Sequence, residues 1–243
     1  MRQDSVNAMT MKMKDMTRME IIARIYTDFH SKFGIPRQSG LVSELRGRIV
    51  FEEKYRSPEA VRGLEEFSHI WLLWQFSEAI RKEWSPTVRP PKLGGNTRMG
   101  VFATRSPFRP NPIGLSSVVL DRVEFSEKLG PVLHVLGADL MNGTPIYDIK
   151  PYLPYADSHP EAVGGFTDSL TLPLLQVEIP EALLCKIPEE KREALRQVLA
   201  QDPRPSYQNE PDRVYGFGFA GFEVRFCVRE NVLVVKEIEK ALY

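Results

Sequence analysis

Residues 115–125 read LSSVVLDRVEF and residues 131–140 read PVLHVLGADL, and these two stretches decide the fold. Both are rich in β-branched and other apolar residues, which is typical of strands. Further segments of the same kind occur at residues 19–29, 47–52, 69–76, 99–104 and 145–152. Strands that follow one another with little intervening helix predict a mainly antiparallel barrel or sandwich, rather than alternating β and α units.

One helix is expected among these strands. The segment SPEAVRGLEEF at residues 57–67 begins with a serine and a proline. Ser57 suits the N-cap position and Pro58 the first helical position, because proline lacks the N–H group that a first turn leaves unpaired. We therefore predict a helix that begins at this point.

A second, smaller unit follows a break in the pattern. Small and polar residues at 158–170 predict a linker. Beyond it, residues 172–179 suit a strand, 187–201 a helix and 221–239 a hairpin with its turn near Glu230 and Asn231. The predicted organisation is a disordered extension, a β-barrel domain, the linker and a small α+β domain, with boundaries at residues 1–17, 18–157, 158–170 and 171–243.

Composition narrows the class of protein. The 243 residues are 42% apolar, enough for a proper core, and 32 basic residues balance 32 acidic ones. A neutral total argues against a protein coated with positive charge, but the charge is uneven. Residues 81–110 hold seven basic residues and one acid, Glu83, which indicates an anionic partner or else a solvated face. Two cysteines with no C-x-x-C pair, and no signal peptide or membrane span, predict a cytoplasmic protein.

The motifs of most enzyme classes are missing or misplaced. GFGFAG at residues 216–221 matches a dinucleotide-binding pattern, but an alternating strand follows where the phosphate-binding helix would have to begin. The four histidines are far apart and show no metal-ligand spacing, so we expect no metal. The sequence also has no Walker A or G-x-S-x-G motif.

The stretch TRSPFRPNPIGLS at residues 104–116 is unusually stiff and basic. Proline fixes φ, and each residue before a proline is held extended, so Ser106, Arg109 and Asn111 are all restricted. A loop ordered in this way loses little entropy when it binds a ligand, and its arginines suit a carboxylate or a phosphate. The alternative is a rigid connection whose arginines lie in solvent.

A second stretch, DLMNGTPIYDIKPYLPYAD at residues 139–157, also carries polar groups. Asn142 and Gly143 indicate a tight turn. The strand that follows places Asp148 and Lys150 on one face, as either a functional couple or a plain ion pair.

Four long segments together carry a resemblance to a known family. They are VRGLEEFSHIWLLWQF, WSPTVRPPKLGGNTRMGVFATRSPFRPNPIGLS, NGTPIYDIKPYLPYAD and LAQDPRPSY. These segments resemble the TrmO (YaeB/TsaA-like) family of S-adenosylmethionine-dependent tRNA methyltransferases, from about residue 19 to the end. Asn142 departs from the pattern, because an aspartate often precedes the Gly-Thr-Pro turn in the family.

The resemblance implies a compact antiparallel β-barrel that binds the methyl donor, followed by a small C-terminal domain. It implies methylation at N6 of N6-threonylcarbamoyladenosine, the purine at tRNA position 37. It also implies a cytoplasmic homodimer whose active site is close to the subunit interface. Two alternatives stay open, namely a non-catalytic RNA-binding module and a methyltransferase that acts on a small metabolite.

The family motifs also imply which residues form the site. Those implied for donor binding are Gln38, Ser39, Gly40, His69, Ser77, Glu78, Arg105, Leu115, Leu136, Gly137, Ala138 and Asp139. Those implied for the tRNA substrate are Arg98, Arg109, Asn111, Lys150 and Tyr155. The candidate catalytic residues are Asp148, Asp139 and Lys150, since a carboxylate can take the proton that N6 loses and a cation can bind the threonyl carboxylate.

Overall fold

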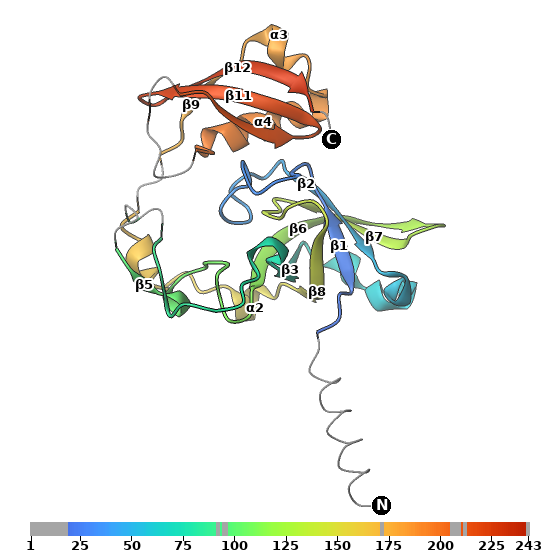
Figure 1. Ribbon diagram of the computed structural model, residues 1–243. Helices are drawn as coiled ribbons and strands as arrows, with labels where there is room; N and C mark the ends of the chain where they lie inside the picture. The colour runs from blue at the N-terminus through green and yellow to red at the C-terminus, as the bar shows by residue number, and fades with distance from the viewer. Residues whose placement is uncertain are drawn as a thin grey trace, which may run out of the picture.

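The structure is a computed structural model that describes residues 19–90, 93, 97–170, 173–204, 210 and 213–241. The predicted disordered extension at residues 1–17 lies outside the described residues, as does part of the segment LAQDPRPSY. Figure 1 shows two bodies of unequal size, with the barrel below and a smaller β-sheet domain above it.

Six antiparallel strands close into a barrel, as expected from the strand-rich sequence. Around the barrel the order is β1-β2-β7-β6-β3-β8, and every neighbouring pair is antiparallel. The strands are β1 (Ala23–Tyr26), β2 (Arg46–Phe51), β3 (His69–Gln75), β6 (Ile113–Ser126), β7 (Gly130–Leu136) and β8 (Thr144–Pro151). Closure leaves the barrel without an open edge.

The barrel interior is filled by alternating side chains. In β3, Ile70, Leu72 and Trp74 are buried, while the residues between them face outward. Trp74 is the largest of these, and it packs on Gly114 of the neighbouring strand, where an added Cβ would lie 2.2 Å from the indole ring. Glycine is therefore the residue that lets this tryptophan fill the end of the barrel.

The helix predicted at residues 57–67 is wrong in type. The segment forms two 3-10 turns, η2 (Pro58–Val61) and η3 (Leu64–Glu66), with a third turn, η1 (Glu53–Tyr55), before them. Gly63 separates η2 from η3 and has a φ of +80°, a left-handed conformation that ends a helix. The turn η4 (Ser77–Ala79) and the short helix α2 (Pro154–Asp157) follow β3 and β8.

The basic segment after η4 forms an arm that extends from the barrel (Figure 1). Its regular structure is limited to β4 (Thr87–Val88), paired with β5 (Met99–Gly100), and a 3-10 turn, η6 (Val101–Ala103). The strand predicted at residues 99–104 is thus only two residues long. A turn, η7 (Gly165–Thr167), lies between α2 and the second domain.

The second domain is a four-stranded sheet with helices. The strand order is β10-β11-β12-β9, and its strands are β9 (Gln176–Glu178), β10 (Tyr215–Phe219), β11 (Phe222–Arg229) and β12 (Val232–Lys240). Helix α3 (Glu181–Leu184) is short, whereas α4 (Glu189–Ala200) packs Leu195, Val198 and Leu199 into the core. The GFGFAG motif forms β10 and the turn into β11, so no helix begins there.

A loop of the barrel, residues 28–45, belongs to the core of the second domain. Phe29, Val42 and Leu45 are buried among the side chains of α4 and the C-terminal sheet. The contact is also polar, because the backbone N–H of Ala220 donates to the carbonyl of Asp28 at 2.9 Å. The Asp28 carboxylate accepts from Lys191 of α4 at 2.5 Å. The two domains are therefore joined through this loop.

Within the described residues, no helix combines the length and the hydrophobicity that spanning a membrane would require.

Candidate functional site

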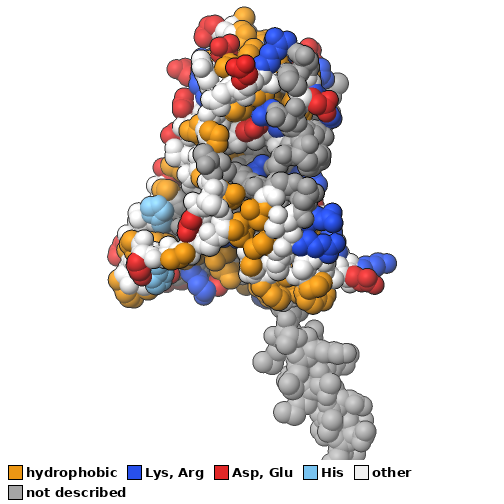
Figure 2. All heavy atoms as spheres, turned by 90° about the vertical axis from the view of Figure 1, so that its left-hand side faces the viewer, with side chains coloured by type: hydrophobic (Ala, Val, Ile, Leu, Met, Phe, Trp, Pro, Cys, Tyr) orange, Lys and Arg blue, Asp and Glu red, His pale blue; other side chains and the backbone are white. Residues whose placement is uncertain are grey.

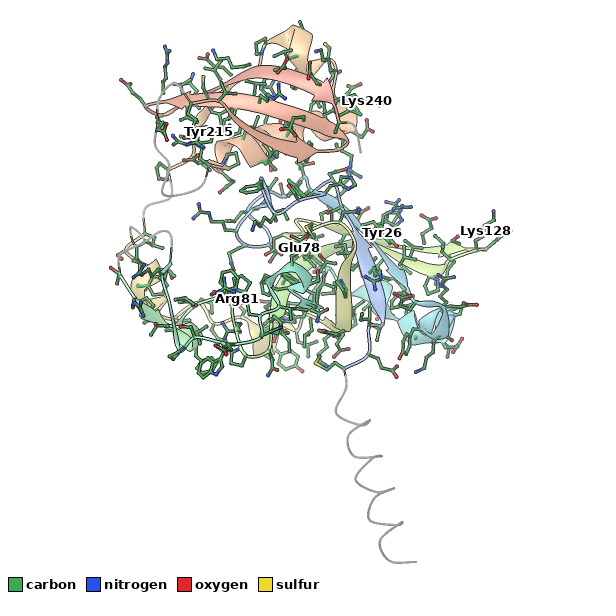
Figure 3. The ribbon with its side chains drawn as sticks, viewed as in Figure 1. Tyr26, Glu78, Arg81, Lys128, Tyr215 and Lys240 are labelled. Carbon is green, nitrogen blue, oxygen red and sulfur yellow. The ribbon has the colours of Figure 1, made fainter. Side chains whose placement is uncertain are left out.

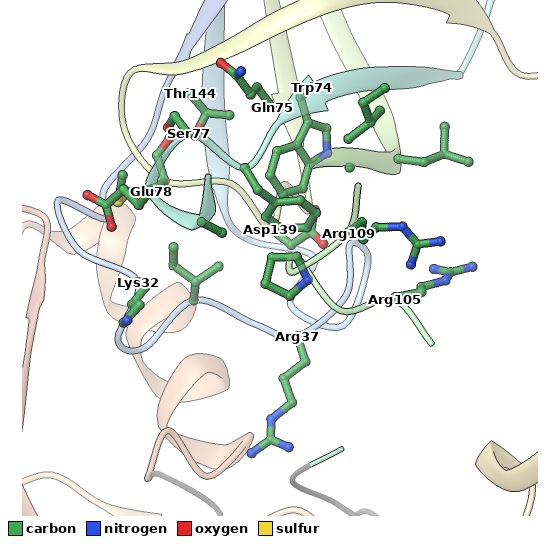
Figure 4. A pocket seen from close by; sticks show the side chains of 18 of the residues that line it. Lys32, Arg37, Trp74, Gln75, Ser77, Glu78, Arg105, Arg109, Asp139 and Thr144 are labelled. Carbon is green, nitrogen blue, oxygen red and sulfur yellow. Dashed lines mark hydrogen bonds between the residues drawn. The ribbon is translucent and has the colours of Figure 1, made fainter. Parts of the chain in front are cut away.

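A pocket of about 610 Å³ opens at the end of the barrel, beside the 28–45 loop (Figure 4). Four parts of the chain line it: the loop at residues 32 and 35–38, the end of β3 with η4 at residues 74–79, the proline-rich loop with the start of β6, and residues after β7. Pockets of this size suit small-molecule ligands. The strand ends bring together residues that are far apart in the sequence.

The proline-rich loop is held to the barrel by backbone hydrogen bonds. Phe76 N donates to the carbonyl of Pro112 at 2.8 Å, and Ile113 N donates to the carbonyl of Asn111 at 2.8 Å. Since the prolines restrict the rest of the loop, residues 104–109 form a fixed wall of the pocket.

The floor of the pocket contains a chain of hydrogen bonds that ends on Asp139. Trp74 Nε1 donates to Ser116 Oγ at 3.0 Å, and Ser116 Oγ donates to Asp139 Oδ1 at 2.6 Å. Backbone N–H groups of Asp139 and Ser39 also donate to this carboxyl group. Because Trp74 occupies the acceptor side of the serine oxygen, the hydroxyl proton points at the carboxylate.

Burial raises the pKa of Asp139 above its usual value of 3.8, although its hydrogen bonds and the charge of Arg105 oppose the rise. Removal from water disfavours the charged carboxylate, and here this penalty exceeds the stabilisation from its partners. A carboxyl group with a raised pKa at the floor of a pocket is a candidate for proton transfer.

Two arginines lie on one side of the pocket and an acid lies on the other. Figure 4 shows the side chains of Arg105 and Arg109 close together, with Glu78 on the opposite side. Arg105 is exposed and donates to the Gln38 side chain. Arg109 donates through Nη1 to the carbonyls of Thr104 at 2.6 Å and Val101 at 3.3 Å, so it also holds its own loop.

Apolar side chains complete the lining. They include Phe76, Ile113 and Leu115, and Leu115 is 54% exposed although it faces the pocket. Phe108 lies at the rim, where the guanidinium carbon of Arg81 is 3.5 Å from the centre of its ring. Lys32 and Arg37 of the 28–45 loop also line the pocket. The pocket therefore offers a ligand apolar surface, two carboxylates, three guanidinium groups and one ammonium group.

Half of the residues implied for donor binding line this pocket. They are Gln38, Ser77, Glu78, Arg105, Leu115 and Asp139. Ser39, Gly40, Gly137 and Ala138 are close in the chain to lining residues but do not line the pocket, and Leu136 lines a separate cavity. The backbone N–H of Gly40 donates to the carbonyl of Gly137 at 2.9 Å and joins the loop to the barrel. This bond and the bond from the Ser39 N–H to Asp139 hold the wall and the floor in position.

His69 lies at the other end of β3 from the pocket-lining Gln75. Its Nδ1 is 2.9 Å from Ser68 Oγ, and its ring is 6.1 Å from that of Tyr152.

Of the residues implied for substrate binding, Arg109 lines the pocket and the others lie elsewhere. Arg98 is on the arm and donates to Thr87 at 3.3 Å, and Tyr155 of α2 is 87% exposed. Lys150 forms an ion pair with Asp148 at 2.9 Å on β8, outside the pocket. Asn111 lies in the proline-rich loop before β6 but does not line the pocket. Of the three candidate catalytic residues, the pocket contains Asp139.

The sequence interpretation missed Trp74, Ser116 and Thr144. Ser116 carries a readable signal, because it is a hydroxyl at an inward position of a strand, between the inward Gly114 and Val118. A buried hydroxyl needs a hydrogen-bond partner, and Ser116 donates its proton to Asp139. Nothing local in the sequence indicates that Trp74 bonds to this serine.

No group of three or more histidine, cysteine, aspartate or glutamate side chains is placed to hold a metal ion in the part of the chain that the structure describes.

Comparison with known proteins agrees with this arrangement. The N-terminal domain profile of tRNA-methyltransferase O matches residues 24–158, and the TrmO C-terminal domain profile matches residues 173–241. A tRNA (adenine(37)-N6)-methyltransferase of Escherichia coli is 44% identical over 233 residues, which cover 91% of this chain and 97% of the relative. The enzyme of the same name from Eikenella corrodens is 45% identical over 172 residues, covering 71% and 97%.

Comparison with solved structures gives the same result as comparison of the sequences. The crystal structure of TrmO from Pseudomonas aeruginosa superposes with a TM-score of 0.75 at 34% identity, over 91% of this chain and 97% of that one. Matches to both domain profiles, in the same order and over most of the chain, establish that this protein belongs to the TrmO family.

Proposed function

We propose that this chain transfers a methyl group from S-adenosylmethionine to N6 of N6-threonylcarbamoyladenosine at tRNA position 37. The coarser activity follows from the family: the chain is an S-adenosylmethionine-dependent tRNA (adenine(37)-N6)-methyltransferase. The observation that carries the finer proposal is the Asp139 floor beneath the Arg105 and Arg109 wall, since the modified base brings both an acidic N–H and a carboxylate.

The pocket suits the methyl donor by its chemistry. S-adenosylmethionine supplies an activated methyl group on a cationic sulfur, and it also carries an ammonium, a carboxylate and an adenine ring. Glu78 and Asp139 offer negative charge to its cations, and Arg105 offers a planar fork to its carboxylate. Leu115, exposed in the pocket, provides the apolar surface that a ring would cover.

We assign Asp139 as the general base. The N6 nitrogen of the acceptor bears a carbamoyl group, so its N–H is more acidic than that of a plain adenine. The Asp139 carboxylate takes this proton as N6 gains the methyl group. Ser116 and the backbone N–H groups hold the carboxylate in one orientation, and burial brings its pKa toward the range in which a base is effective. Asp148 is the weaker candidate, because it pairs with Lys150 outside the pocket.

We assign Arg109 to the threonyl carboxylate of the substrate. Its Nη1 is engaged by loop carbonyls, which leaves Nε and Nη2 for a ligand. The loop holds this guanidinium in place, so little side-chain entropy is lost on binding.

We also infer that the chain is a cytoplasmic homodimer. The homodimer is supported by the exposed apolar surface of the arm. Trp84 is 54% exposed, Phe102 is 72% exposed, and the centres of their rings are 6.2 Å apart. Figure 2 shows hydrophobic side chains gathered on the face of the molecule that the arm forms. Light scattering after gel filtration measures the mass, and a monomer at micromolar concentration would contradict the dimer.

The proposed function is tested with two preparations of the same tRNA, with and without the threonylcarbamoyl group. Labelled methyl from S-adenosylmethionine should enter the modified tRNA alone, because plain adenosine leaves the substrate-binding cation unpaired. Nucleoside analysis by mass spectrometry then identifies the methylated product. Equal labelling of both preparations would contradict the finer proposal, and labelling of neither would favour a non-catalytic RNA-binding protein or a metabolite methyltransferase.

A further inference from the structure

A second cavity, of about 450 Å³, lies on the outer face of the barrel beneath α4. It shares no lining residue with the pocket at the end of the barrel, which we call the donor pocket. We call it the basic groove, and its charged and aromatic residues are Tyr26, Asp28, His30, Arg46, Arg48, Asp121, Arg122, His134 and Lys191. Figure 3 shows Tyr26, in the groove, and Glu78, at the mouth of the donor pocket, at separate places on the barrel.

The strand register aligns four of these side chains in a row. Tyr26 of β1 is opposite Arg48 of β2, Arg48 is opposite His134 of β7, and His134 is opposite Arg122 of β6. Side chains directly opposite each other on adjacent strands lie about 5 Å apart at Cβ and share a face of the sheet. Their strand neighbours Ile25, Ile49 and Leu133 are buried, so the row faces outward.

Three basic residues in or near the row have acidic partners. Arg122 pairs with Asp121 at 2.8 Å, Lys191 pairs with Asp28 at 2.5 Å, and His134 Nε2 is 2.8 Å from Glu124. Arg122 Nη2 also lies 3.4 Å from His134 Nε2.

Arg46 and Arg48, in contrast, are exposed, and within the described ranges neither side chain has a hydrogen bond or an ion pair. The two lie two residues apart on β2 and so point to the same side. Like charges side by side on a strand, with Arg122 in the same row, disfavour the folded state. A concentration of positive charge that the protein leaves uncompensated indicates a ligand that supplies the negative charge.

The chemistry of the groove fits the sugar-phosphate backbone of an RNA. Guanidinium groups bind phosphate oxygens through two parallel hydrogen bonds, and an exposed row of them suits successive phosphates better than one enclosed anion. Tyr26, 41% exposed at the end of the row, offers a ring on which a base can stack. Contacts to phosphates position a nucleic acid on a protein without reading its sequence.

We propose that the basic groove binds the phosphate backbone of the substrate tRNA and positions it while its modified base occupies the separate donor pocket. This inference rests on the proposed function, because it takes a tRNA as the substrate. Arg46 and Arg48 are the principal contacts, and Arg122 and Lys191 are held at the sides of the groove by their acidic partners.

The test compares R46A/R48A with a matched control, R225A. Arg225 is also an exposed strand arginine, but it lies on β11 and pairs with Glu237 at 2.6 Å. Fluorescence anisotropy with labelled tRNA at several salt concentrations gives the affinity and its salt dependence. We expect R46A/R48A to bind tRNA at least about tenfold more weakly, and to lose about 1.4–1.8 from the slope of log K against log salt.

Other measurements separate this role from a structural one. R46A/R48A should keep the wild-type thermal midpoint and its affinity for S-adenosylmethionine, and R46K/R48K should recover most of the lost tRNA affinity. A tRNA affinity and salt slope equal to those of the wild type would overturn the proposal, as would equally tight binding of a polyglutamate of similar charge. If the wild-type chain itself neither bound nor methylated tRNA, the proposed function would be wrong. If the wild type did both and R46A/R48A matched it, only the proposed role of the basic groove would be wrong.

Discussion

In the proposed mechanism, the chemistry of the site depends most on Asp139, the proposed general base. Its pKa is raised, chiefly by burial, so the folded chain binds this proton more tightly than the unfolded chain does. The stability that comes from this protonation is fully present below the usual pKa of 3.8, taken for the unfolded chain, and is lost as pH rises through the higher folded pKa. At neutral pH the protein therefore bears the cost of a buried carboxylate.

Replacing Asp139 with asparagine should separate stability from activity. Asparagine keeps an oxygen that accepts from Ser116 and cannot ionise, so D139N should be more stable than the wild type at pH 7. Its free energy of unfolding should also vary less with pH above 4 than that of the wild type. Urea unfolding at several pH values measures both effects. Methyl transfer should fall roughly 100-fold or more, because a positioned base contributes about that much.

The control for this substitution is D148N, at the other candidate base. Asp148 is paired with Lys150 outside the pocket, so D148N should retain most of the activity. A large loss of activity in D148N, together with near-normal activity in D139N, would assign Asp148 as the base instead of Asp139.

Substitutions of Arg105 and Arg109 should weaken the binding of different substrates. Arg105 bonds to Gln38 in the wall proposed for the donor, so R105A should weaken the binding of S-adenosylmethionine about tenfold or more. R109A should raise the KM for modified tRNA by a similar factor and leave donor affinity nearly unchanged. Calorimetry with the donor and steady-state kinetics with tRNA measure the two effects.

R109K is the conservative control for this pair, since it keeps a charge but lacks the guanidinium fork. Equal losses of donor affinity in R105A and R109A would place both arginines in the donor site and would contradict the division of roles.

At the scale of elements, the 28–45 loop is the part of the pocket that the second domain holds in place. Gly34 has a φ of +83°, and a Cβ at this position would lie 2.2 Å from the ring of Phe217. Ile35, the next residue, packs on the C-terminal core and lines the pocket. A displacement at Gly34 therefore moves the pocket wall.

We expect G34A to lower donor affinity severalfold as well as stability. G63A is the matched control, because Gly63 has a φ of +80° but nothing within 4 Å of the added Cβ, and it lies in the turn between η2 and η3. Both variants should lose about 1–2 kcal/mol from the left-handed backbone alone. Calorimetry should then show reduced donor binding in G34A only. Reduced donor binding in both variants, or in neither, would contradict the proposal that the 28–45 loop shapes the donor site.

The elements themselves were largely predictable, and the exceptions have local causes. Alternating runs such as residues 115–125 became strands, since a strand needs one apolar face and the sequence shows it directly. The segment at residues 57–67 has a good helix start, but Gly63 adopts a left-handed conformation and divides it. Proline and glycine in the arm limited β5 to two residues.

The site was less predictable than the strands, because its contacts join distant segments. Asp139 and Arg105 could be named from the motifs. The bond from Trp74 to Ser116, across 42 positions, depends on barrel closure, which periodicity does not specify. The sequence left Asp148 and Lys150 as either a functional couple or a plain ion pair. In the structure they form an ion pair on β8, outside the pocket.

At the scale of the whole molecule, the two domains share a core and are not independent. The family resemblance implies donor binding within residues 18–157, because the two long motifs of the site both end before residue 158. Three of the buried residues in that range, Phe29, Val42 and Leu45, pack instead against the C-terminal domain. We therefore propose that the barrel part contains the donor site and that the C-terminal domain is required to shape it.

Removal of the C-terminal domain should reveal this dependence. A fragment of residues 19–170 would expose Phe29, Val42 and Leu45, at a cost of about 1.5–3 kcal/mol for each buried side chain. We expect the fragment to retain a β-rich circular dichroism spectrum and to bind S-adenosylmethionine at least tenfold more weakly than the full chain. Donor affinity equal to that of the full chain would show that the loop needs no support from the second domain.

The central claim is that the pocket between the 28–45 loop and the proline-rich loop holds the methyl donor above Asp139. A crystal structure of the full chain with S-adenosylhomocysteine, the demethylated product, tests it most directly. We predict that the ligand lies against Leu115, within hydrogen-bonding distance of Arg105, and with its sulfur facing the Asp139 side of the pocket. Density for the ligand in the basic groove, or anywhere that leaves Asp139 and Arg105 untouched, would contradict the account.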